Sequence, residues 1–106
     1  MEREILSPKL IRQEYGTLIL HEHWCPGCES MHQIAVETPF RNGARWSWDG
    51  NVFSPTFSPS INCGPGTPCC CHYFIKAGKI EFCGDSHHEL RGQTVDLPDI
   101  PEYWLD

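Results

Sequence analysis

Cysteines and histidines at metal-ligand spacing are the part of this sequence best suited to chemistry. Cys25-Pro26-Gly27-Cys28 lies between two strand-like runs, and its two-residue spacing lets both thiols face one ion. Gly27 permits the tight turn of such a zinc knuckle. A redox pair is the alternative, but thioredoxin-type motifs belong to a βαβ pattern that this sequence lacks. The motif therefore predicts metal binding.

The second half of the site is expected in the run from Cys69 to His72. Together with the knuckle, a Cys-x-x-His pair would complete a Zn²⁺ site of three thiolates and one imidazole. Adjacent strand residues point to opposite faces, so an extended backbone lets only one of Cys71 and His72 reach the ion. If Cys71 binds, His88 could be the fourth ligand and His72 would belong near the metal or to a separate site. The candidate metal ligands are Cys25, Cys28, Cys71, His72 and His88, and whether Cys69 joins them stays open.

The other histidines, acids and cysteines are not assigned as metal ligands from their spacing. His32, four residues after the knuckle, could approach it or be a hydrogen-bonded structural residue. His21 and His23 share one strand face, the spacing of paired ligands of a catalytic metal, but no acid at a recognisable offset completes that site. Asp85 could orient an imidazole or cap a helix. The remaining cysteines are interpreted as small core or loop thiols: Cys63, Cys70 and Cys83.

Short β-branched and aromatic runs between turn signals must position these residues. They predict a mostly β fold, a small zinc-stabilised antiparallel domain built from hairpins with a zinc knuckle and one short helix. The expected strands are 17–24, 32–37, 44–48, 52–53, 72–76, 79–83 and 93–97. Two prolines make 54–61 an edge strand or an extended loop, because proline cannot donate to a ladder. The helix is expected to begin at Ser86, where Glu89 completes a capping box, and to end near Gly92.

Length and composition indicate one domain, 1–106, with an N-terminal segment 1–12 and an extended acidic tail 98–106. No run has the length of a membrane span, and the first twelve residues lack signal-peptide features, so a cytoplasmic protein is expected. In that reducing compartment, seven cysteines favour ligands and free thiols over disulfides. At 106 residues, a bound metal is one of few ways to add stability.

Acidic residues dominate the last quarter of the chain. Seven acids and one base, Arg91, lie between Glu81 and Asp106, which accounts for the whole net charge of −6. Such a segment repels a phosphate backbone, so nucleic-acid binding is not expected. It is either a solvated tail or a patch for a basic protein partner. The sequence does not indicate an oligomeric state.

Several segments, in order from Trp24 to Trp104, resemble a small uncharacterised family encoded in phages and prophages and often labelled ammonia monooxygenase. They are 24–28 with His32, 46–50, 55–61, 71–75, 84–85, 88–90 and 92–95. The sequence lacks the spans of an oxygen-activating membrane enzyme, so that label is set aside. Family members usually carry a cysteine where this chain has Ser86, and Cys83 lies three residues earlier. The resemblance implies a phage-type protein in the host cytosol.

A looser similarity connects the chain to small proteins of bacterial ubiquitin-like conjugation operons. The shared features are the cysteine knuckle, a Ser-Pro-Ser-Ile segment at 58–61 and a Cys-x-x-His-Tyr segment at 69–73. Those proteins have been suspected of being peptidases, and the similarity implies the same possibility here by analogy.

Two functions follow from these observations. The favoured one is a metal-stabilised protein-interaction or accessory module, with a closed four-ligand zinc site and a host or phage protein as partner, because sites with three sulfurs are usually structural. The alternative is a zinc-dependent hydrolase or peptidase with an open metal position. Its base would come from Glu22, Glu29 or Asp85.

Overall fold

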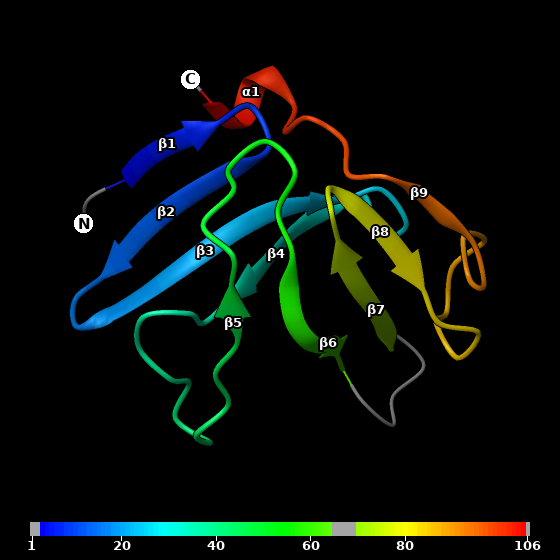
Figure 1. The fold of residues 1–106 in the computed structure, drawn as a ribbon, viewed down its shortest axis with the longest axis horizontal. Helices are drawn as coiled ribbons and strands as arrows, with labels where there is room; N and C mark the ends of the chain where they lie inside the picture. Colours follow the sequence, from blue (N-terminus) through cyan, green and yellow to red (C-terminus); the bar gives the residue numbers. More distant parts are fainter. Residues whose placement is uncertain (1–2, 65–69, 106) are drawn as a thin grey trace.

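Two antiparallel sheets and one short helix make up the computed structural model, which describes residues 3–64 and 70–105 (Figure 1). The first sheet, in the order β1-β2-β3-β4, contains β1 (Arg3–Ser7), β2 (Leu10–Tyr15), β3 (Leu18–Cys25) and β4 (Ser30–Ile34). The second, in the order β5-β6-β7-β8-β9, contains β5 (Ser47–Trp48), β6 (Phe57–Cys63), β7 (Cys71–Lys76), β8 (Lys79–Phe82) and β9 (Thr94–Asp96). The helix, α1, is Glu102–Leu105. The mostly β, antiparallel class predicted from the sequence is confirmed.

The core lies between the two sheets and takes residues from both. Leu10, Cys25 and Ile34 of the first sheet cluster with seven residues of the second: Phe57, Ile61, Cys71, Tyr73, Ile75, Ile80 and Phe82. On β7, the buried residues alternate with more exposed ones, as the two-residue period of a strand requires. Cys71 therefore faces the core, whereas His72 faces outward.

The expectation of an edge strand or loop at 54–61 is wrong, because β6 lies inside its sheet, between β5 and β7. Its pairing with β7 runs from Phe57 opposite Ile75 to Ile61 opposite Tyr73, so β6 has two extra residues in this interval. Pro59 falls in this irregular stretch, where regular ladder pairing is already interrupted. Bulges of this kind bend a strand and redirect its side chains. Ser60 lies in the same irregular stretch.

The expected helix at 86–92 is absent, and turns and bends occupy that segment. Ser86 does not cap a helix, because its hydroxyl hydrogen-bonds the backbone of His72 instead. The helix that does form, α1, lies in the tail predicted to be extended, directly after Pro101, whose carbonyl accepts a hydrogen bond from Trp104 N–H. Proline is compatible with a helix start. Within the described residues, no helix has the length and apolar character of a membrane span.

Candidate functional site

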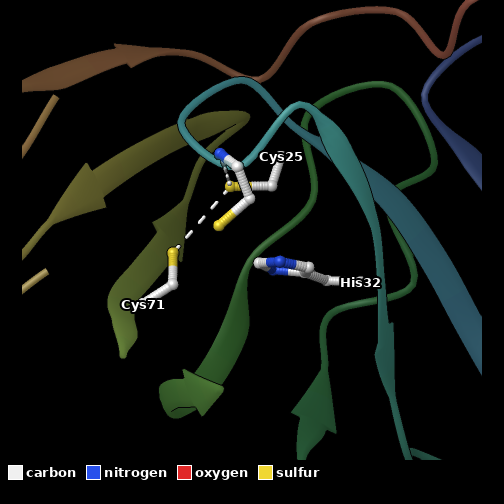
Figure 2. Close-up of side chains that lie close together, drawn as sticks. Cys25, His32 and Cys71 are labelled. Atoms are coloured by element: carbon white, nitrogen blue, oxygen red, sulfur yellow. Dashed lines mark hydrogen bonds between the residues drawn. The ribbon is translucent and has the colours of Figure 1, made fainter. Parts of the chain in front are cut away.

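Three cysteines and one histidine converge at one end of the core (Figure 2). Cys25 ends β3, Cys28 lies three residues later in the knuckle turn, His32 is on β4 and Cys71 begins β7. One potential ligand atom from each lies within 4.8 Å of all the others. Cys25 Sγ and Cys71 Sγ are 3.9 Å apart, too far for a disulfide, which needs about 2.05 Å. Two thiolates on a tetrahedral zinc lie about 3.8 Å apart, so the dimensions suit a metal ion.

The three clustered thiols, Cys25, Cys28 and Cys71, shift one another's pKa values. A hydrogen bond from Cys71 lowers the pKa of Cys25 to about 7, and the same bond raises the pKa of Cys71. Burial, and then the charge on Cys25, raise the pKa of Cys28 to about 11. Each thiolate that forms makes the next less favourable unless a cation compensates the accumulated charge. A divalent ion would provide that compensation.

A chain of buried hydrogen bonds fixes the tautomer of His32. His23 Nδ1 lies 3.2 Å from the Trp24 carbonyl and must donate to it, so neutral His23 accepts at Nε2 from the Tyr73 hydroxyl, 2.7 Å away. The Tyr73 oxygen then accepts from His32 Nδ1 at 3.0 Å. Burial lowers the pKa of His23 to about 3 and that of His32 to about 4, which keeps both rings neutral. Neutral His32 is left with a lone pair on Nε2, as a metal ligand requires.

His88 has the opposite tautomer. Its Nδ1 accepts a hydrogen bond from the Leu90 backbone at 3.2 Å, which places the proton of the neutral ring on Nε2. Nε2 lies 3.3 Å from Cys71 Sγ and therefore donates to that sulfur. His88 thus suits a role as a hydrogen-bond donor to the thiolate, and His32 suits the fourth ligand position.

The outer face of the second sheet carries a different arrangement. Ser60 Oγ lies 3.0 Å from His72 Nε2, and His72 Nδ1 lies 3.3 Å from both carboxylate oxygens of Asp85. Nδ1 donates to the carboxylate, which leaves Nε2 free to accept the serine proton. These contacts place a serine, a base and an orienting carboxylate in the order of a Ser-His-Asp triad. That arrangement activates a serine hydroxyl for attack on a carbonyl.

The loop after β8 positions the histidine and the carboxylate of this triad. Ser86 is buried, and its hydroxyl accepts from His72 N–H at 3.0 Å and donates to the His72 carbonyl at 2.8 Å. Cys83 N–H also donates to that carbonyl, at 2.8 Å. Ser86 therefore substitutes for a ladder partner of β7 and holds Asp85, the preceding residue, against the imidazole. The same loop continues to His88, which reaches the cysteine cluster.

Residues 2–83, 82 of the 106, match a family described as bacterial ubiquitination-like system serine protease (BubE). The chain belongs to the BubE family. No curated protein and no solved structure matches it. The matched region contains Ser60 and His72 and ends two residues before Asp85, so the carboxylate is assigned by geometry alone. The predicted similarity to proteins of ubiquitin-like operons is confirmed at the level of the family, while a phage origin stays a prediction.

This BubE-family structure brings together three of the five residues predicted as ligands, Cys25, Cys28 and Cys71. His88 adjoins them through Cys71, whereas His72 lies with Ser60 and Asp85 on the other face. Cys69 lies outside the described residues. His21 and His23 share the inner face of β3 and are buried in the core, with no acid completing a metal site among the described residues.

Ser60 is a candidate functional residue that was not predicted from the sequence. The sequence did contain a signal for it. The Ser-Pro-Ser-Ile segment contains Ser60, the Cys-x-x-His-Tyr segment contains His72, and both segments are shared with proteins of ubiquitin-like conjugation operons. What the sequence did not provide was the pairing of β6 with β7, which brings the two segments together.

The assignment of the fourth ligand leads to a first prediction. His32→Ala is expected to lose most of the bound metal, because it removes the imidazole of the four-residue group that could hold the ion. His88→Ala removes a hydrogen bond to a thiolate and should keep close to one equivalent of metal, with affinity lowered by about 10- to 100-fold, as for outer contacts of metal sites. Elemental analysis and competition with a chelator measure both effects. Metal loss in His88→Ala with retention in His32→Ala would reverse the assignment.

A second prediction concerns Gly27 in the knuckle. A Cβ at this position would lie 2.2 Å from two atoms of the His88 ring, so the ring packs directly against the glycine backbone. Gly27→Ala must displace the buried imidazole and is expected to cost about 1–3 kcal/mol of the free energy of unfolding. The double variant Gly27→Ala/His88→Ala should recover most of this loss relative to His88→Ala. Thermal unfolding compares the four proteins, and an additive double variant would contradict the contact.

Proposed function

We propose that this BubE-family protein is a serine protease whose fold is stabilised by zinc. The observation that carries the proposal is the hydrogen-bonded series Ser60, His72 and Asp85 on the outer face of the second sheet. The family description names the same class of enzyme. The first line of support rests on atomic positions and the second on the sequence match.

In the proposed reaction, Ser60 Oγ attacks the carbonyl carbon of an amide while its proton passes to His72 Nε2. His72 then gives this proton to the departing amine as the C–N bond breaks, which leaves an ester on Ser60. A water molecule, deprotonated by the same nitrogen, hydrolyses the ester and restores the serine. Asp85 stabilises the imidazolium in both steps by accepting from Nδ1–H.

Asn62 is well placed to help stabilise the negative charge that develops on the substrate oxygen. It is the cross-strand partner of His72 and lies two residues beyond Ser60 on β6. Its Oδ1 accepts from the Cys70 thiol at 3.3 Å, which turns the amide N–H₂ group away from that contact. A side-chain amide is an established type of oxyanion donor in serine proteases.

Zinc in the Cys25, Cys28, His32 and Cys71 cluster would join β3, β4 and β7 and so stabilise the fold. The cluster can supply four protein ligands, three of them sulfurs, which is typical of a structural site. The alternative, a zinc hydrolase with an open metal position, is not favoured. No step of the proposed reaction passes through the metal.

The substrate in this proposal is a polypeptide of a bacterial ubiquitination-like system, following the family description. A host or phage protein partner, and an interaction role for the acidic tail, stay predictions. A protease must also bind a protein, so the predicted interaction module and the enzyme are compatible.

Covalent labelling of Ser60 tests the proposal directly. A fluorophosphonate probe is expected to modify the parent protein, with the adduct found by mass spectrometry on the peptide that contains Ser60. Ser60→Ala should abolish labelling. Ser58→Ala is the matched control, because Ser58 is an exposed serine two residues earlier on the same strand. The Ser58→Ala protein should be labelled at Ser60 as the parent is. An unlabelled parent protein, or equal labelling of Ser60→Ala, would refute the proposal.

A further inference from the structure

We propose that the outer face also holds an inhibitory zinc site, formed by His72, Cys83 and Asp85. Its binding of zinc is independent of the enzyme's activity, whereas its inhibitory effect rests on the proposed serine protease. The site uses two residues of the triad and one thiol for which the reaction has no role.

The three side chains already have the spacing of a metal site. One ligand atom from each, an imidazole nitrogen, a thiol sulfur and a carboxylate oxygen, lies within 4.8 Å of the other two. Cys83 directly follows β8, and its backbone N–H donates to the His72 carbonyl at 2.8 Å, which fixes the two residues side by side. Nitrogen, sulfur and oxygen donors together suit zinc, and three protein ligands leave one position for water or substrate.

Solvent reaches this group much more readily than it reaches the cysteine cluster. The side chain of His72 is 26% exposed and that of Asp85 is 60% exposed, whereas Cys25 and Cys71 are fully buried. The two ligand sets share no residue and lie on opposite faces of β7. An ion on the outer face can therefore exchange with the medium while the inner site stays filled.

Zinc on the outer face would disable the triad through the tautomer of His72. The nitrogen that contacts Asp85 is Nδ1, and it must give up its proton to become a ligand beside that carboxylate. A neutral imidazole that binds metal through Nδ1 carries its proton on Nε2, where it can no longer accept the Ser60 proton. Metal coordination also takes the Asp85 carboxylate away from its orienting role. The proton-accepting and the zinc-bound states of His72 are mutually exclusive.

The experiment starts from protein that holds one equivalent of zinc and measures two quantities during zinc addition. Equilibrium dialysis counts bound zinc, and a fluorophosphonate probe reports the labelling rate of Ser60. The parent is expected to bind a second equivalent of zinc. Its labelling rate should fall more than about tenfold, since His72 can no longer act as the general base. A chelator that leaves the first equivalent in place should restore labelling.

Cys83→Ala separates this site from other effects of zinc. It should label like the parent without added zinc, bind one equivalent only and be insensitive to further zinc. Cys70→Ser, which alters a buried thiol outside both ligand groups, should bind the second equivalent of zinc as the parent does. A parent that binds no second equivalent, or Cys83→Ala that binds it equally well, would overturn the site. A parent that is never labelled would refute the protease, and the dialysis would still decide whether the zinc site exists.

Discussion

Replacing Cys25 by serine is expected to remove the metal and the cooperative fold together. Cys25 is fully buried, lies 3.9 Å from the Cys71 sulfur and is part of the hydrophobic core. Structural zinc sites contribute about 10–16 kcal/mol of apparent binding free energy, which is comparable with the whole stability of a small domain, about 5–15 kcal/mol. A hydroxyl in place of the thiolate would therefore remove most of the margin of stability.

Elemental analysis, circular dichroism and thermal unfolding measure this effect on the same samples. Cys70→Ser is the matched control, because Cys70 is a buried thiol next to Cys71 that does not belong to the ligand group. It should keep one equivalent of metal and a cooperative transition. A Cys25→Ser protein that is folded and fully metal-loaded would show that Cys25 is not a ligand.

Asp85→Asn is expected to lower turnover by about 10⁴-fold with little change in stability. An asparagine amide in place of the carboxylate can donate to Nδ1, which favours the tautomer with the proton on Nε2 and so blocks the base. The Asp85 side chain is 60% exposed, so its replacement disturbs little packing. Initial rates on a peptide or ester substrate that the parent cleaves, together with the melting temperature and the metal content, separate chemistry from folding.

Glu81→Gln is the matched control for charge, since Glu81 is an acid on β8 whose side chain is 39% exposed and pairs with Lys76. It removes one negative charge from the second sheet without contacting His72 and should retain nearly all of the turnover. Wild-type turnover in Asp85→Asn would show that the carboxylate does not orient the base.

Periodicity in β7 made part of the site predictable from sequence. The alternation of adjacent strand residues required Cys71 and His72 to diverge, and the structure places them on opposite faces. The Cys-x-x-Cys spacing likewise indicated a cluster at the end of β3. Both inferences rest on local geometry, which a sequence specifies directly.

Long-range contacts were not predictable in the same way. The pairing of β6 with β7 that joins Ser60 to His72 depends on a register irregularity around Pro59, a residue that argued for an edge strand. Ser86 matched a capping box because its hydroxyl needs a backbone partner, and the structure supplies that partner from β7 instead of a helix. In both places a tertiary contact overrides a local preference.

The divergence of Cys71 and His72 on β7 also limits how this segment can change in length. A single-residue insertion or deletion within the strand exchanges the two faces for every residue beyond it. Such a change would turn the His72 imidazole into the core or the Cys71 thiol out of it. The cysteine cluster and the triad would then be disrupted together. Length variation among relatives should therefore be confined to segments such as the loop between β5 and β6, and β7 should keep a constant length.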